Sequence, residues 1–262
     1  MDLIERVRQL NQSLLDRVAP QRVVFHHVPK CGGTSVARAL RRRYLTSQAT
    51  VRPEPSFRAY QTFTGRADTE GMASDVDDLR KQMMLYLLHD DVRCVSLHAP
   101  FSGRAFDQFN SSYKFITILR EPISRFVSHY NWSSHRPEAH GYIKEDFDTF
   151  LETERAQSLG SEFVEFFADL PCSYDKRGAE AIKTAIANLR RLDAVGRLDN
   201  LPAFSRDLQS VLGIKINFGH ENRTHRGANL VSANALTDRQ KAIIHDICAP
   251  DIAVWESLFR ES

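Results

Sequence analysis

The chain has 262 residues, of which 42% are apolar and 26% are charged, and its formal net charge is +2. The length allows a substantial core, and the near-neutral charge argues against a nucleic-acid-binding protein or a membrane-surface binder. No segment approaches the roughly 20 apolar residues of a membrane span, and the first residues do not resemble a signal peptide. Four cysteines without a CxxC pair argue against a disulfide framework or a zinc site, so we expect a soluble, cytoplasmic protein.

Apolar periodicity and turn residues divide the chain into short strands and helices. Residues 1–19 are predicted to form a helix, RVVFHHV a strand that Pro29 ends, and SVARALRRRY a second helix. Residues 46–74 are polar and punctuated by Pro and Gly, which predicts a long loop. The other predicted elements are strands at 92–98, 113–120 and 192–198, and helices at 75–90, 121–132, 145–154, 161–169, 179–191, 200–212 and 237–259.

Strands that alternate with helices are typical of an α/β protein whose parallel sheet is covered by helices on both faces. No repeat or linker interrupts the chain, so the sequence predicts a single domain over 1–262 with a mostly helical C-terminal half. Ligands of such sheets bind at the carboxyl ends of the strands. Because Lys30, His98 and Arg120 each follow a predicted strand, we expect them at one edge of the sheet.

The segment PKCGGTS after the first strand has the composition of an anion-binding turn. Gly32 and Gly33 allow positive φ angles and a close approach of backbone N–H groups to a ligand. Thr34 and Ser35 open the next helix, where unpaired N–H groups and the helix dipole attract a phosphate or sulfate group. Lys30 adds a mobile charge, although it precedes the glycines, unlike the lysine of a Walker loop. The alternative is a purely structural strand–turn–helix corner.

The segment LREPISRFVSHY predicts a second anion pocket. Arg120 lies at a strand end, and Ser128 lies about two turns into the next helix, where Arg125 is expected to share its face. An arginine and a hydroxyl that converge near a helix N-terminus can bind an anion. The alternative is that Arg120 pairs with Glu121 or another carboxylate and that Ser128 has no binding role. Two anion pockets at one edge indicate a ligand with phosphates at two places.

The segments HVPKCGGTS, VSLHAPF and LREPISRFVSHY together resemble the sulfotransferase superfamily, and most of all the carbohydrate sulfotransferases similar to heparan sulfate 2-O-sulfotransferase. LRRLDAVGRLDNLPAF, GHENRTHRG and LTDRQKAIIHDICAPDIAVWESLF also look familial, so the resemblance extends from about Val23 to Phe259. It implies a P-loop-like fold and transfer of the sulfuryl group of 3′-phosphoadenosine-5′-phosphosulfate (PAPS) to an acceptor hydroxyl, or less readily to an amine. Relatives that act on secreted glycans carry a membrane anchor, whereas this chain resembles a soluble bacterial type.

The resemblance also implies which residues bind PAPS. The loop would hold the 5′-phosphosulfate, with the Cys31 side chain pointing away from the loop N–H groups. The Arg and the Ser eight positions later would hold the 3′-phosphate, and a late basic loop would contact the 3′-phosphate or the adenine. No metal is expected, since lysine and backbone dipoles supply the positive field. The implied nucleotide-binding residues are Lys30, Cys31, Gly32, Gly33, Thr34, Ser35, Arg120, Ser128, Arg223 and Arg226.

Two residues are predicted to be catalytic. Lys30 is placed to neutralise the charge that develops on the leaving oxygen. His98 is the candidate base for the acceptor hydroxyl, because an imidazole titrates near neutrality and the resemblance places a histidine at this strand end. The alternative for His98 is a structural role. His26 and His27 are expected to lie inside the first strand with structural roles.

Two other readings of the sequence stay open. A nucleotide kinase would need a Gly-Lys-Ser/Thr loop and an acidic residue at a strand end, and neither follows VVFHHV or ITIL. A non-catalytic module could bind the nucleotide without transferring sulfate. The residues do not select the acceptor, a small molecule or a glycan, and they do not indicate an oligomeric state. Tyr130 and Trp132 are expected to pack in the core rather than to line an acceptor pocket.

Overall fold

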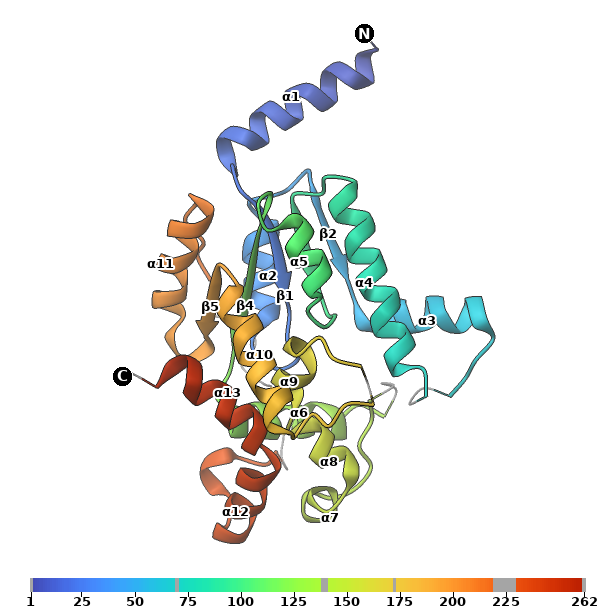
Figure 1. Cartoon of the computed structure of the whole chain (residues 1–262), viewed down its shortest axis with the longest axis vertical. Coiled ribbons are helices and arrows are strands. Elements are labelled where there is room, and N and C mark those ends of the chain that lie inside the picture. The colour runs from blue at the N-terminus through green and yellow to red at the C-terminus, as the bar shows by residue number, and fades with distance from the viewer. Residues whose placement is uncertain (1, 69–70, 138–140, 172, 219–229, 261–262) are drawn as a thin grey trace.

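The computed structural model describes residues 2–68, 71–137, 141–171, 173–218 and 230–260 (Figure 1). At its centre is a five-stranded parallel sheet with the strand order β2-β3-β1-β4-β5. The strands are β1 (Arg22–His26), β2 (Gln48–Val51), β3 (Cys94–Leu97), β4 (Tyr113–Leu119) and β5 (Ala194–Arg197). The predicted α/β class with a parallel sheet is confirmed.

Helices make up most of the rest of the described chain. The α-helices are α1 (Leu3–Val18), α2 (Gly33–Arg41), α3 (Pro53–Thr64), α4 (Ala73–His89), α5 (Gly103–Phe109), α6 (Pro122–Ser134), α7 (Phe147–Leu151), α8 (Glu154–Leu159), α9 (Glu162–Phe167), α10 (Ala179–Arg191), α11 (Leu201–Leu212), α12 (Asp238–Ile247) and α13 (Ala249–Phe259). Short 3-10 helices, η1 (Leu198–Asn200) and η2 (Ala233–Ala235), complete the set. None of the helices in these described ranges is long and apolar enough to cross a membrane.

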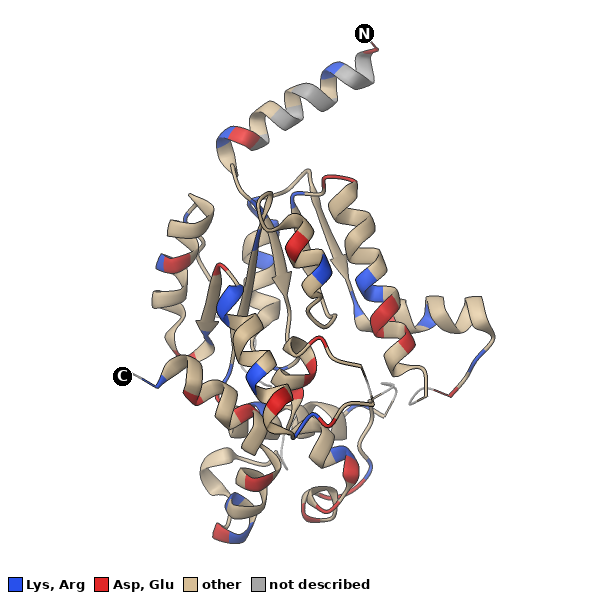
Figure 2. Cartoon of the chain, in the orientation of Figure 1, with Lys and Arg blue, Asp and Glu red and all other residues tan. Residues whose placement is uncertain are grey.

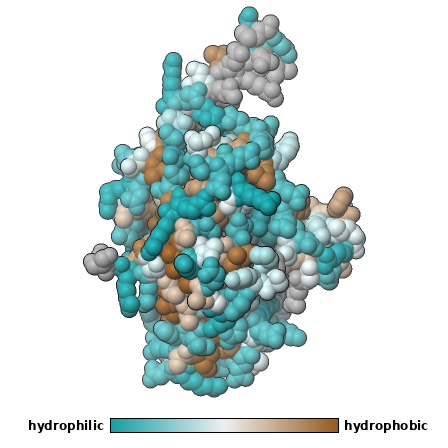
Figure 3. Space-filling view, viewed as in Figure 1, coloured by the Kyte–Doolittle hydropathy of each residue, from teal (hydrophilic) through white to brown (hydrophobic). Residues whose placement is uncertain are grey.

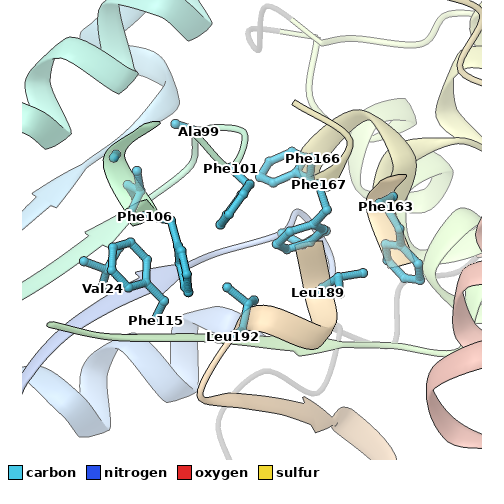
Figure 4. Packing of buried hydrophobic residues seen from close by; sticks show 14 of the residues in the cluster. Val24, Ala99, Phe101, Phe106, Phe115, Phe163, Phe166, Phe167, Leu189 and Leu192 are labelled. Atoms are coloured by element: carbon cyan, nitrogen blue, oxygen red, sulfur yellow. The ribbon is translucent and has the colours of Figure 1, made fainter. Parts of the chain in front are cut away.

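The central strands are buried on both faces, which is why they appear in the sequence as continuous apolar runs. Along β1, Val23 and Phe25 pack with α2 and α11, whereas Val24 packs on the other face with α4, α5, α9 and α10. The second face is rich in aromatic rings (Figure 4): the ring centre of Phe106 lies 5.7 Å from that of Phe101 and 5.0 Å from that of Phe115. Helices therefore cover both faces, as predicted.

A third apolar cluster lies beyond the carboxyl ends of the strands and supports α6. Phe126 and Tyr130 on the inner side of α6 pack against Phe147 and Phe150 of α7 and against Ile247 at the end of α12. This packing holds α6 below the sheet in the view of Figure 1. Tyr130 is buried in this cluster, so the prediction that it packs in the core is confirmed.

The prediction of a loop over 46–74 is wrong, because this segment contains β2 and α3. β2 lies at the edge of the sheet with only Val51 fully buried, so its sequence, QATV, shows no apolar run. It forms a strand because it pairs with β3. Pro53 and Pro55 suggested turns, but they lie in the first turn of α3, where proline is tolerated because no helical N–H bond is lost.

The surface carries charges of both signs. Lys and Arg are interspersed with Asp and Glu over the helices in the view of Figure 2, and most of the face in Figure 3 is hydrophilic. An apolar hollow of about 490 Å³ lies between α10 and α13, where Ile182 and Ile186 line it. None of the predicted site residues lines this hollow.

Candidate functional site

Three predicted site segments lie at neighbouring strand ends. β1 pairs with β3 on one side and with β4 on the other, and all three strands are parallel. The Lys30 loop follows β1, His98 follows β3 directly, and Arg120 follows β4 directly. Because parallel strands end at the same edge, the sheet brings these segments to one side of the molecule, as the sequence predicted.

The Lys30 loop leaves the N-terminus of α2 open. Lys30 and Gly32 have φ angles of 64° and 76°, so the chain turns through the left-handed region at both positions. Gly32 is the N-cap of α2, and no side chain caps this helix and no acidic residue lies in its first turn. The N–H groups of such a helix start are available to an external anion.

Both loop glycines are also required by close packing. A Cβ at Gly32 would lie 2.4 Å from a side-chain carbon of Leu198, and one at Gly33 would lie 2.0 Å from the ring of His27. Any larger residue would therefore require the neighbouring side chain or the loop to shift. Cys31 is buried beneath the loop, as expected, and burial raises the pKa of its thiol to about 12.

Positive charge accumulates beside the loop. The Lys30 Nζ lies 5.2 Å from the ring centre of Trp132, and the Arg136 guanidinium carbon lies 4.8 Å from the same ring. Burial, followed by the charges of Arg136 and Arg120, lowers the pKa of Lys30 to about 8. Within the described ranges, no hydrogen bond or ion pair connects these three cations to a carboxylate. An anion bound here would relieve their mutual repulsion.

Arg136 and Trp132 lie close to Lys30 and were not among the predicted site residues. Trp132 is only half-buried, so the expectation of core packing is wrong for this residue. Trp132 follows Ser128 by one helical turn, and Arg136 lies just beyond the end of α6 by the same spacing. The spacing of four between Ser128, Trp132 and Arg136 could have predicted this arrangement, because residues four apart lie on one helix face.

The N-terminus of α6 differs from that of α2. The carboxylate of Glu121 accepts hydrogen bonds from the N–H groups of Ile123 and Ser124 at 2.9 and 2.7 Å. Arg120 and Ser128 are half-buried at the predicted positions. The N–H groups of Ile123 and Ser124, however, already donate to Glu121 and are not open to a ligand. No hydrogen bond or ion pair joins Arg120 to Glu121 within the described ranges, although burial, the larger effect, lowers the pKa of Arg120 and the charge of Glu121 raises it. A second anion pocket here would depend on side chains.

Arg125 does not share the exposed face of Ser128, so that expectation is wrong. Its side chain is fully buried, with guanidinium nitrogens 3.6 Å from Glu162 Oε2 and 3.7 Å from Asp251 Oδ2. It also donates a hydrogen bond to the carbonyl of Leu159. Arg125 therefore belongs to an ionic cluster that joins α6 to α9 and α13, two elements far away in the sequence.

His98 is held at the end of β3 by its backbone and its ring. Its N–H donates to the carbonyl of Val51 at 3.1 Å, and its ring centre lies 3.9 Å from that of His27. Burial, with a smaller contribution from Arg80, lowers the pKa of His98 to about 4. The Nδ1 atom has no hydrogen-bond partner among the described residues. His98 is therefore neutral near pH 7.

His26, the last residue of β1, and His27, which follows it, have different surroundings. His26 is buried among aromatic rings on the inner face and contacts the carbonyl of Ala99 at 3.4 Å, which fits the predicted structural role. His27 lies outside the strand, since β1 ends at His26, and its ring lies between Gly33 and His98. Arg223 and Arg226 lie outside the described residues.

A comparison with known families defines the chain as a sulfotransferase by class. The model of the Sulfotransferase family matches residues 17–260, and the chain belongs to this family. A crystal structure of a sulfotransferase from Alicyclobacillus acidocaldarius is similar to it, with 17% sequence identity, a TM-score of 0.51 and coverage of 92% of this chain and 97% of that chain. This second likeness shows the fold. No match was found among curated proteins.

Proposed function

We propose that the protein transfers the sulfuryl group of PAPS to a hydroxyl, or less readily an amine, of a carbohydrate or small-molecule acceptor. One observation carries this proposal: the N-terminus of α2 has no side-chain cap at a glycine turn, and burial, followed by the charges of Arg136 and Arg120, lowers the pKa of the adjacent Lys30 side chain. Membership of the sulfotransferase family supports the reaction class.

The residues present fit the donor nucleotide. The turn at Gly32 and Gly33 packs closely against Leu198 and His27, and N–H groups at the start of α2 are open to the 5′-phosphosulfate. Thr34 and Ser35 follow in the first turn of α2, where their hydroxyls would add hydrogen bonds. In this proposal, side chains alone hold the 3′-phosphate, namely those of Arg120 and Ser128. Arg223 and Arg226 keep their proposed role at the 3′-phosphate or adenine.

Lys30 would stabilise the leaving group. PAPS supplies the sulfuryl group, whose bond to the bridging oxygen breaks with the electron pair going to that oxygen. The Lys30 ammonium stabilises this charge. A nearby anion raises the pKa of Lys30 above its value of about 8 in the free protein, which keeps the side chain charged during transfer.

His98 would take the acceptor proton. Because its pKa is lowered to about 4, the imidazole is neutral near pH 7 and has a free lone pair. As the acceptor oxygen bonds to sulfur, its proton moves to His98, and the negative charge nearby favours the imidazolium. Within the described residues no group of side chains could hold a metal ion, and Lys30 with the α2 N-terminus forms the positive field of this proposal.

Calorimetry with adenosine 3′,5′-bisphosphate tests the donor site. We expect binding by the wild-type protein and a loss of about 10- to 100-fold in affinity in Lys30→Ala and Arg120→Ala, since each removes a charge-assisted contact. Arg17→Ala on α1 is the control, because Arg17 is exposed and α1 precedes β1 at the opposite edge of the sheet. Absence of binding by the wild-type protein would contradict the proposal.

Transfer itself is tested with sulfur-labelled PAPS and a panel of hydroxyl and amine acceptors. Mass spectrometry of the product then gives the acceptor and the modified atom. We expect His98→Ala to keep its affinity for the bisphosphate while transfer falls by about 100-fold or more. Equal losses of binding and transfer in His98→Ala would argue against its role as the base.

A further inference from the structure

The His27 ring lies in a row of close contacts that connects the donor loop to the candidate base, His98. The ring centre of His27 lies 5.6 Å from that of Phe25 and 3.9 Å from that of His98, with interplanar angles of 20° and 38°. The same His27 ring fills the space where Gly33 lacks a side chain. One imidazole thus contacts both the first residue of α2 and His98.

We propose that His27 is a positioning residue of the sulfuryl-transfer site, whose ring fixes the distance between the donor loop and His98. This inference rests on the proposed function. The backbone of His98 is anchored from the other side, by the hydrogen bond to Val51 of β2. His27 thus supplies the anchor for the ring on the side of β1. The reacting groups come from β1 and β3, and a misplacement by about 1 Å can lower a rate by about 100-fold.

The surroundings of His27 keep this ring uncharged. Its pKa lies well below the ordinary value because of burial first, and then because of His98, Arg41 and Lys30. Arg80 also contributes to lowering the pKa of His98, and its guanidinium donates hydrogen bonds to Ser56 and Asp77 at 2.8 Å each. When His98 takes a proton, its positive charge therefore faces the flat side of a neutral aromatic ring. A second imidazolium at this position would repel it.

The proposal therefore predicts that transfer requires a flat, uncharged ring at position 27 and does not require a nitrogen that titrates. His27→Phe keeps the ring face and roughly the volume, and should keep kcat within about threefold of the wild type. His27→Ala removes the support on the β1 side and should lower kcat by about 100-fold. The KM for PAPS should change by less than about threefold in both variants, since the loop N–H groups and Lys30 stay in place. His245→Ala on the exposed side of α12 is the control.

Titration of His98 followed by NMR of labelled histidine gives a readout that needs no turnover. In the wild type and in His27→Phe the ring should titrate near pH 4. In His27→Ala water reaches the ring, and its pKa should move toward the ordinary value of about 6.5. The acid limb of kcat/KM should move in the same direction, because it reports the free enzyme. A purely structural role would lower the thermal midpoint without separating the Phe and Ala variants in titration.

Two results would overturn the inference: an unchanged His98 titration and kcat in His27→Ala, or equal losses in folded His27→Phe and His27→Ala. If His27→Ala does not fold, His27→Leu replaces it, because leucine fills the volume without a flat face. The proposed function fails by a different result, which is no binding of adenosine 3′,5′-bisphosphate by the wild type. The NMR titration tests whether His27 controls the environment of His98, whether or not the protein binds the nucleotide.

Discussion

The two turns that follow β1 and β4 have the same plan but opposite electrostatics. Each leads from a buried strand into a helix at the same edge of the sheet. At α2, the N-cap is Gly32 and no side chain accepts from the first N–H groups. At α6, the Glu121 carboxylate accepts from two of them. The first helix start is thus open to a ligand, whereas the second carries its own anion.

An anion bound at the start of α2 would therefore contact backbone N–H groups, whereas one bound at the start of α6 would contact side chains. The α2 N-terminus beside Lys30 has no side-chain cap, which leaves backbone N–H groups for a bound anion, as the proposed function requires. At α6 the cap leaves side chains alone to bind a ligand. The two arginines of this second turn have separate tasks: Arg125 is buried in an ionic cluster, and Arg120 is half-buried at the sheet edge.

The largest expected effect separates these two arginines by stability. Arg125→Met leaves Glu162 and Asp251 buried without their cation and should lower the free energy of unfolding by about 3–5 kcal/mol. Arg120→Met should change it by less than about 1 kcal/mol, because no partner is left unpaired. Urea unfolding measures both. Similar losses in the two variants would remove the distinction between them.

Next in size is the effect of Lys30 on transfer. Lys30→Ala should lower kcat by about 100- to 1000-fold, because it removes the charge opposite the leaving oxygen. Arg136→Ala should lower it by about tenfold at most, since Arg136 is exposed and screened. Single-turnover assays with saturating PAPS separate this effect from binding. A greater loss in Arg136→Ala than in Lys30→Ala would reverse the assigned roles.

A smaller effect tests the capped turn directly. Glu121→Ala removes the carboxylate that caps α6 and should lower stability by about 1 kcal/mol, whereas Glu121→Asp, also a capping residue, should retain most of it. The affinity for adenosine 3′,5′-bisphosphate should change by less than about threefold. Thermal unfolding and calorimetry on the same samples check both parts. Loss of nucleotide binding in Glu121→Ala would show that the cap also shapes the donor site.

The smallest effect concerns the pH dependence that Lys30 confers on the free protein. The pKa of Lys30 is about 8 in the folded chain, whereas its ordinary value is 10.5. Between pH 8 and pH 10.5, the Lys30 amine is therefore protonated in the unfolded chain and mostly deprotonated in the folded chain. The contribution of Lys30 to stability therefore rises with pH from about 8 to 10.5.

Lys30→Met should consequently raise the thermal midpoint at pH 7 by about 2 °C, a small value because solvent screens the partly exposed amine. The gain should vanish as the pH approaches 10.5. Scanning calorimetry from pH 7 to 10.5 measures the difference between variant and wild type. A midpoint of Lys30→Met below that of the wild type at pH 7 would contradict a repulsive environment at Lys30.

The sequence by itself determined the elements whose signals are local. A continuous apolar run identifies β1 and β4, because both faces of these strands are buried. Two adjacent glycines before two hydroxyl residues identify the open turn, because positive φ at Gly32 is a property of the local backbone. The positions of Lys30, His98 and Arg120 followed from strand ends alone.

Only the tertiary structure decided what depends on contacts between distant segments. The polar strand β2 exists because β3 pairs with it. Arg125 points inward because α9 and α13 bring carboxylates to it. Packing between distant segments also places Arg136 near Lys30. It likewise places the ring of His27 against that of His98. Local propensity carries no information about such partners, since they are set by how whole helices and strands pack.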